Sequence, residues 1–300
     1  MPIIDAHVHL YPPEVERDPS GWAEGRGERH WATLCTRRRR DGRLVQSLPT
    51  VDQTLAAMDA AGVERAVLLG WYWETFETCV WQNHFYADCV REHPDRLAAC
   101  ATFHPQPGEK AVLAELVRAR EDGLVGLGEL SPHSQGFGID DPTFRGALAW
   151  AQDAGWPVNI HVTDPDSRPF PGRIETPLRD FVALAADFPR LPLVLAHWGG
   201  LLPLREPAIR GRRNVYYDTA ASPLLYDSTV WGRFFAAVPA SQILFGSDFP
   251  LNLYPRTSVS AEMAQFAREA EAAGAPASLL HENAAALFFR DAQSPVDRGV

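Results

Sequence analysis

The sequence opens with Pro2-Ile-Ile-Asp-Ala-His7-Val-His9-Leu10, an apolar segment that carries two histidines two positions apart. Side chains at positions i and i+2 of a β-strand point to the same face, so both imidazoles are expected on one side. Two neutral imidazoles on one face suit a divalent metal. A strand end with two polar side chains facing water would give the same pattern, so this pair needs support from elsewhere in the chain.

That support comes from other apolar segments that end in residues able to bind metals. They are Asn-Ile-His161, Leu-Ala-His197, Leu-Phe-Gly-Ser-Asp248 and Gly-Leu-Gly-Glu129. Four imidazoles and two carboxylates at strand ends fit Zn, Mn or a similar divalent metal, as one ion or two. We therefore expect a metal centre formed by His7, His9, Glu129, His161, His197 and Asp248.

Eight short apolar segments alternate with amphipathic segments of helical length. The expected strands are Ile3–Val8, Arg65–Leu69, Leu97–Phe103, Leu124–Glu129, Val158–His161, Leu193–His197, Val215–Asp218 and Ile243–Gly246. The expected helices include Val51–Ala61, Cys79–Glu92, Lys110–Glu121, Pro142–Ala154, Pro177–Asp187 and Ser228–Ala237. Such alternation predicts parallel β-α units, and eight of them indicate an α/β fold with one (β/α)8 TIM barrel over residues 1–300. Gly62, Gly123 and Gly155 each follow a helical segment and are expected to end it.

Two segments fall outside this repeat. Residues 11–50 are expected to form a long, loop-like insertion after the first strand, typical of a lid or binding loop. The insertion carries the basic run Arg37–Arg40, which is either a solvated loop or a clamp for an anionic substrate. A final helix, Pro276–Arg290, is expected to pack outside the barrel.

Composition excludes several classes of function. The chain is 46% hydrophobic and 22% charged, as expected for a full core, and its net charge of −10 disfavours nucleic-acid binding. No run of about 18 apolar residues predicts a membrane span. The four cysteines form no Cys-x-x-Cys pair and no basic leader precedes the first strand, which favours a cytoplasmic protein with reduced thiols. A small-molecule substrate is the expected partner, and a homodimer the expected oligomer.

The combined motifs Asp-Ala-His7-Val-His9-Leu, Asn-Ile-His161, Leu-Ala-His197-Trp-Gly-Gly and Leu-Phe-Gly-Ser-Asp248-Phe-Pro resemble those of the amidohydrolase superfamily. They are most similar to its "amidohydrolase 2" group of metal-dependent hydrolases and decarboxylases. The segment Asn283-Ala-Ala-Ala-Leu-Phe is similar to that group's terminal helix, so the resemblance covers essentially the whole chain. The motifs are specific for the superfamily but not for a substrate.

The resemblance implies that His7, His9, His161 and Asp248 hold a catalytic metal. It also implies that His197 binds a second metal or polarises the substrate, and that Asp248 takes a proton from the attacking water. One departure is that Glu129 stands where many two-metal members carry a carboxylated lysine. A glutamate at this position resembles the TatD-like nucleases, where it bridges two metals; the alternatives are a partner that orients a ligand or a buried ion pair.

Four further residues are weaker candidates for the substrate site. Trp71, His104, His133 and Trp198 lie at or just after expected strand ends, where ordinary rim packing is an equal explanation. No Gly-x-Ser-x-Gly elbow indicates a serine hydrolase, and no P-loop is present.

The sequence therefore predicts a metal-dependent hydrolase that uses activated water on an ester, lactone or amide of a small organic acid. Asp248 and His197 are the expected catalytic residues. The first alternative is a metal-dependent decarboxylase of an aromatic or unsaturated acid. The second is a ligand-binding barrel without activity, which the proton-accepting Asp248 argues against.

Overall fold

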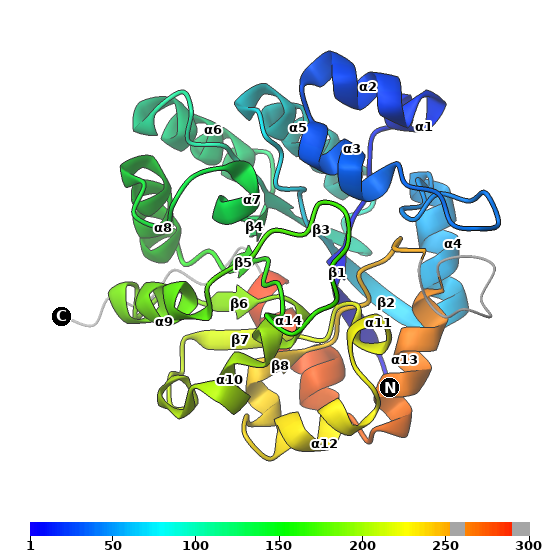
Figure 1. Cartoon of the computed structure of the whole chain (residues 1–300), viewed down its shortest axis with the longest axis vertical. Coiled ribbons are helices and arrows are strands. Elements are labelled where there is room, and N and C mark those ends of the chain that lie inside the picture. Colours follow the sequence, from blue (N-terminus) through cyan, green and yellow to red (C-terminus); the bar gives the residue numbers. More distant parts are fainter. Residues whose placement is uncertain (253–261, 290–300) are drawn as a thin grey trace.

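The structure is a computed structural model, and it describes residues 1–252 and 262–289 (Figure 1). Eight parallel strands lie in chain order within one sheet. They are β1 (Ile3–Val8), β2 (Val63–Leu68), β3 (Leu97–Ala101), β4 (Gly126–Leu130), β5 (Val158–Ile160), β6 (Leu193–Leu195), β7 (Val215–Asp218) and β8 (Ile243–Leu244). The ring closes where the backbone N–H of Ala6 donates to Phe245 O at 2.8 Å and that of His9 to Phe249 O at 2.7 Å. The predicted TIM barrel is confirmed.

Helices connect the strands and surround them (Figure 1). The α-helices are α1 (Pro13–Arg17), α2 (Pro19–Arg26), α3 (Arg29–Cys35), α4 (Val51–Ala61), α5 (Phe76–Glu92), α6 (Glu109–Glu121), α7 (Pro132–Gln135), α8 (Pro142–Ala154), α9 (Leu178–Asp187), α10 (Leu202–Arg205), α11 (Ser222–Leu225), α12 (Thr229–Phe235), α13 (Met263–Ala272) and α14 (Asn283–Phe288). Short turns of other helix types are η1 (His197–Leu201), η2 (Pro207–Ile209), η3 (Ala240–Gln242) and η4 (Ser278–Glu282).

Local sequence signals set the ends of these helices. Thr50 and Gln53 form a reciprocal capping box at the start of α4, and Gly62 ends that helix with a left-handed φ of 69°. Asp141 caps α8 through the N–H of Phe144, and Gly155 ends α8 with the same φ of 69°. The predicted helix ends at these glycines are confirmed, and each returns the chain to the barrel at the start of a strand.

The insertion differs from the loop expected there. Residues 13–35 form the three short helices α1, α2 and α3, which are defined by end signals rather than by hydrophobic periodicity. Asp18 caps α2 through the N–H of Gly21, and Gly27 ends it in a left-handed conformation. Trp22 and Trp31 then pack against Trp73, which follows β2, so aromatic contacts fix the insertion to the barrel.

The final helix packs against residues of the barrel interior. Ala284, Leu287 and Phe288 of α14 belong to a buried cluster with Val67 of β2 and Val194 of β6. These strands stand on opposite sides of an eight-stranded ring, so the cluster fills the barrel interior, and α14 packs against it. The spacing i, i+3, i+4 gives α14 the apolar stripe this contact requires. The expected end of the helix at Arg290 lies outside the described residues.

Two expectations from composition can be compared with the described residues. Cys35, Cys79, Cys89 and Cys100 are buried and free of disulfides. None of the described helices is both long and apolar enough to cross a membrane.

Removal of the α14 contact should destabilise the protein. Phe288 is 3% exposed, so Phe288→Ala is expected to lower the free energy of unfolding by about 3–5 kcal/mol through lost burial and a cavity. The measurement is urea denaturation followed by circular dichroism. Val117→Ala on α6, where the side chain is 43% exposed, is the control and should change stability by less than about 0.5 kcal/mol. An equal effect of both substitutions would contradict the role of α14.

Candidate metal centre

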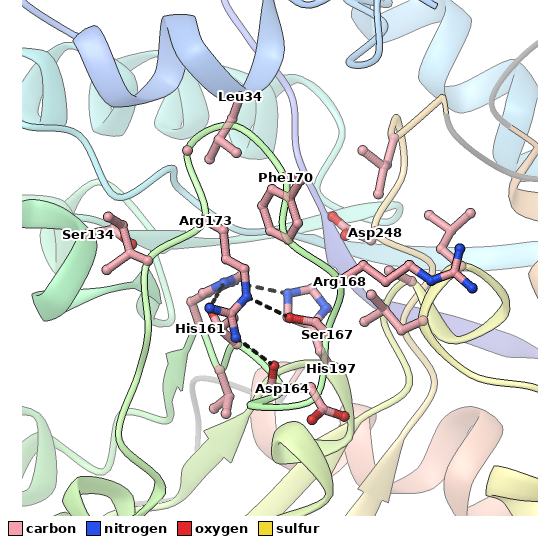
Figure 2. Close-up of a pocket in the computed structure, with 18 of the residues that line it drawn as sticks. Leu34, Ser134, His161, Asp164, Ser167, Arg168, Phe170, Arg173, His197 and Asp248 are labelled. Carbon is pink, nitrogen blue, oxygen red and sulfur yellow. Dashed lines mark hydrogen bonds between the residues drawn. The ribbon is translucent and has the colours of Figure 1, made fainter.

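The barrel brings all six predicted ligands to one place. His7 lies on β1 and His9 just after it, Glu129 on β4, and Asp248 follows β8. His161 directly follows β5 and His197 begins η1, so the expected strands that included them end one or two residues earlier. Figure 2 shows His161, His197 and Asp248 around one cavity. The carboxyl ends of the strands form the functional face of such barrels.

The first group of ligand atoms surrounds His7 and His9. Their Nε2 atoms are 3.2 Å apart. Asp248 Oδ1 lies 3.8 Å from His7 Nε2 and 3.5 Å from His9 Nε2. Glu129 Oε2 lies 4.0 Å and 3.8 Å from the same two nitrogens. Two nitrogens and two carboxylates therefore face a common point.

The second group shares Glu129 with the first. His161 Nδ1 lies 3.0 Å from Glu129 Oε1, and His197 Nε2 lies 3.5 Å from the same oxygen. The two ring nitrogens are 3.2 Å apart. The structure thus places His161 with His197, and the two oxygens of Glu129 face different groups.

Buried acceptors fix the tautomers of three rings. His7 Nδ1–H donates to Asp218 Oδ2 at 2.9 Å, His9 Nδ1–H to Leu69 O at 3.0 Å, and His197 Nδ1–H to Ala220 O at 3.2 Å. Because each Nδ1 keeps its hydrogen, each Nε2 directs a lone pair toward the common point when the ring is neutral. A carboxylate or carbonyl behind a ligating histidine is the usual support of a metal site.

Asp218 is a buried carboxylate of the candidate site that the sequence did not single out. Its Oδ2 accepts from His7 Nδ1 and from Asn159 Nδ2 at 3.0 Å, while its Oδ1 accepts from the backbone N–H of His197 at 2.9 Å. It ends the expected strand Val215–Asp218, so the rule that selected Glu129 could have selected it.

Two residues of the site adopt left-handed backbone conformations. His197 has φ 57° and Asp248 has φ 64°, a region that costs a non-glycine residue about 1–3 kcal/mol. The His197 N–H is held by Asp218, and the Asp248 N–H donates to His7 O at 3.0 Å. The fold therefore constrains the backbone where these side chains must point inward.

The electrostatics of the site favour a positive charge among the ligands. Burial opposes charge on His7, but the facing Asp218 carboxylate outweighs it and raises the His7 pKa to about 10. Burial, together with neighbouring His7, lowers the His9 pKa to about 3. Burial raises the Asp248 pKa to about 6, whereas nearby His161 outweighs burial and holds the Glu129 pKa well below its usual range. A metal cation that binds here would displace the proton on His7 Nε2, while Nδ1 keeps its hydrogen.

The donor set fits a divalent metal. Two nitrogen ligands at about 2.0–2.1 Å from a tetrahedral ion lie about 3.4 Å apart, close to the 3.2 Å found in both histidine pairs. His7, His9 and Glu129 form one compact group of ligand atoms, and Glu129, His161 and His197 form another. Converging lone pairs repel one another unless a cation or a proton lies between them. These residues can hold one ion or two.

A cavity of about 900 Å³ opens above the ligands. His161, His197 and Asp248 line it, together with Trp71, whose ring lies 5.2 Å from that of His9. The insertion supplies one wall through His30 and Arg37, among others. His30 is half-buried, and its Nε2 forms a hydrogen bond with Gly172 O at 2.8 Å.

The other predicted substrate contacts lie outside the lining of this cavity. His104 Nε2 bonds Gln135 O at 3.2 Å, and His133 Nε2 bonds Asp180 Oδ2 at 2.9 Å. Trp198 is fully buried, with its indole N–H donating to Ser222 Oγ at 3.0 Å. A substrate role for these three residues stays a prediction.

The fold places the four arginines of the basic run in different environments. Arg37 lines the cavity. Arg38 donates to Gly42 O at 2.8 Å, Arg39 to Asn252 O at 2.9 Å, and Arg40 is exposed. The run as a whole therefore does not form a clamp, and Arg37 is tied to the insertion through its Nε, which donates to Leu34 O at 3.2 Å.

Solved structures with the same fold cover the chain almost completely. A 2,6-dihydroxybenzoate decarboxylase from Rhizobium is 19% identical, with 96% of this chain and 99% of that chain covered and a TM-score of 0.68. A 5-carboxyvanillate decarboxylase from Novosphingobium aromaticivorans, with bound manganese, is 16% identical, with 96% and 97% covered and a TM-score of 0.70. A candidate 2-pyrone-4,6-dicarboxylic acid hydrolase from Pseudomonas putida is 19% identical, with 96% and 97% covered and a TM-score of 0.64.

These likenesses establish the fold, and the sequence itself establishes the family. No match was found among curated proteins. The family model for amidohydrolases, by contrast, matches residues 4–290, which include all six ligands and Asp218. The resemblance inferred from the motifs is thus confirmed, and the chain belongs to the amidohydrolase family of metal-dependent enzymes.

Proposed function

We propose that this enzyme is a metal-dependent hydrolase that uses water to cleave an ester, lactone or amide of an organic acid. The observation that carries the proposal is the position of Glu129. One of its oxygens faces His7 and His9, and the other faces His161 and His197. A carboxylate divided in this way suits a bridge between two metals, and two-metal sites serve hydrolytic enzymes such as aminopeptidases and phosphatases.

The chain's own residues supply the proton transfers. A bound divalent metal would polarise a carbonyl oxygen and acidify water to near neutral pH. Asp248 lines the cavity, and its side chain is 13% exposed, so it can meet both substrate and water. Its carboxylate accepts a proton from the attacking water and passes that proton to the leaving oxygen or nitrogen. The left-handed backbone at Asp248 holds the carboxylate at this position.

The histidines have distinct tasks in this proposal. His7 and His9 are ligands of the first group, and His161 is a ligand of the second. His197 lines the cavity with Nε2 near Glu129, so it serves as a ligand and as a stabiliser of negative charge on the substrate carbonyl oxygen. Nitrogen and carboxylate donors in these numbers suit Zn or Mn.

A second candidate function is decarboxylation of an aromatic or unsaturated acid. It is favoured by the cavity's arginines, which suit an acidic substrate, and by two similar structures that are decarboxylases. In that reaction Asp248 would deliver a proton to the carbon that loses CO2. His7, His9 and Asp248 would then be the ligands needed, and Glu129 would orient the histidines.

The number of metal ions bound per chain shows whether the site holds one ion or two. Protein purified without chelator and reconstituted with Zn or Mn is expected to hold two ions per chain by elemental analysis. Glu129→Gln should reduce the content to one or fewer, because the amide cannot bridge as a carboxylate does. Glu28→Gln is the matched control, since Glu28 is a fully buried carboxylate outside the site, bonded to Glu74 N and Thr75 Oγ1. Loss of metal in the control, or none with Glu129→Gln, contradicts the bridging role.

Asp218 should act through His7 rather than through the substrate. Asp218→Asn removes the negative charge that faces His7 and one of the two oxygens that accept from His7 Nδ1, Asn159 and the His197 N–H, and metal affinity is expected to fall about 10–100-fold. Competition with a chelating dye measures this change, and excess metal should restore part of the activity. Asp180→Asn removes an equivalent carboxylate from His133, away from the cavity, and should leave the metal affinity unchanged. Equal affinities for wild type and Asp218→Asn would contradict the positioning role.

Isotope labelling distinguishes the two reactions. Metal-loaded enzyme is incubated in H2(18)O with a panel of aryl lactones and esters and, separately, with 2,6-dihydroxybenzoate and 5-carboxyvanillate. Hydrolysis should place one 18O atom in the acid product, and Asp248→Asn should lower kcat by about 100- to 10,000-fold while keeping most of the metal. Release of CO2 from the acids, with no turnover of the panel, would favour decarboxylation and overturn the proposed reaction.

A further inference from the structure

The cavity mouth exposes an unusual amount of apolar surface. Among the described residues five large hydrophobic side chains are exposed, and three of them line this cavity: Phe170 at 40%, Ile174 at 37% and Leu225 at 42%. Exposed apolar side chains that gather at one opening mark a binding surface. The cavity volume of about 900 Å³ is also far larger than a small organic acid requires and falls in the range of sites for drug-sized ligands.

The charges of the cavity differ in sign from those of the chain. The chain has a net charge of −10, yet five arginines line the cavity, against three aspartates. Arg205 forms ion pairs with Asp164 at 3.1 Å and Asp166 at 2.8 Å, and Asp248 belongs to the metal centre. A cavity of this kind attracts anions.

Among the arginines that line the cavity, Arg168 is the one without a partner among the residues that the structure describes and is therefore available to a ligand. Arg173 donates to Ser167 Oγ at 2.9 Å and to the carbonyl oxygens of Asp164 and Pro165. Arg37 donates to Leu34 O, and Arg233 interacts with Asp227. In the described part of the chain, Arg168 lines the cavity with no hydrogen bond or ion pair of its own. Figure 2 shows Arg168 on the side of the cavity where Asp248 lies.

The segment that carries Arg168 and Phe170 is fixed at both ends. At its start, Asp164 accepts from Tyr226 OH at 2.7 Å and pairs with Arg205. At its end, Gly172 O bonds His30 of the insertion, and the Thr163 N–H donates to Thr176 Oγ1 at 2.8 Å. The guanidinium of Arg168 is therefore presented by a braced loop, which reduces the ordering cost of binding a ligand there.

We infer that residues 163–176 form a specificity loop that selects an amphipathic anionic substrate, with Arg168 binding a negatively charged group remote from the reacting carbonyl. The apolar body of the substrate packs on Phe170, Ile174 and Leu225. This inference deepens the proposed function and rests on it for the reacting end of the molecule. It changes the expected substrate from a small organic acid to a larger aryl or alkyl compound with a second anionic group.

Calorimetric titration of the metal-loaded enzyme tests this assignment with pairs of defined ligands. Each pair compares a monocarboxylate with its dicarboxylate: benzoate with terephthalate, 2-naphthoate with naphthalene-2,6-dicarboxylate, and biphenyl-4-carboxylate with biphenyl-4,4′-dicarboxylate. In at least one pair the second carboxylate should tighten binding roughly 10–100-fold, as a charge-assisted hydrogen bond does. Arg168→Gln should abolish that gain, and Arg168→Lys should keep part of it.

Two further variants serve as controls. Arg179→Gln makes the same change of net charge at a side chain that is 88% exposed, and should keep the full gain. Phe170→Ala should weaken the monocarboxylate and the dicarboxylate by the same factor, because it removes apolar contact only. No gain in any pair of the wild type, or a gain that survives Arg168→Gln, overturns the inference. Since the titration requires no turnover, its result is independent of whether hydrolysis or decarboxylation is found.

Discussion

The arrangement of the candidate metal ligands depends on the carboxylate of Asp218. This one fully buried side chain accepts from the ring of His7, from Asn159 and from the backbone N–H groups of His197 and Ala220. It fixes the tautomer of a ligand in the first group and the backbone of a ligand in the second. Because a buried carboxylate is costly without such partners, the network stabilises Asp218 while Asp218 orients the ligands. Each group of ligands therefore contains one residue that Asp218 holds, His7 in the first and His197 in the second.

The barrel makes this arrangement possible because the carboxyl ends of its strands converge on one face. The Nε2 atoms of His7 and His9 lie 3.2 Å apart, a distance that requires a proton or a cation between them. Hydrogen bonds behind each ring, to Asp218 and Leu69 O, prevent the rings from turning away. Repulsion between the ligands and the left-handed backbone conformations of His197 and Asp248 both cost free energy. The packed core around the strands offsets this cost.

Much of the fold and of the candidate metal site could be predicted from the sequence, because consecutive parallel strands end at one face of a barrel. This rule brings Glu129, His161, His197 and Asp248 together, and the glycine helix ends support the register. The rule does not identify residues whose role depends on contacts with distant parts of the sequence. Asp218 was read only as the end of a strand, because nothing local shows that it faces His7. The helices of the insertion and the interior contact of α14 depend on end signals and tertiary packing that periodicity does not reveal.

The substrate was the least predictable feature, and the arginines show why. The run Arg37–Arg40 was conspicuous in the sequence, yet the fold turns Arg38 and Arg39 to carbonyl groups outside the cavity lining. Arg168 was inconspicuous, standing alone in a polar loop. What distinguishes it is that its neighbours Asp164 and Arg173 are committed to holding that loop, which leaves one guanidinium facing the cavity without a partner. Recognition of a charged ligand is thus a property of the whole hydrogen-bond network, since a cation selects a substrate only where the protein has not already neutralised it.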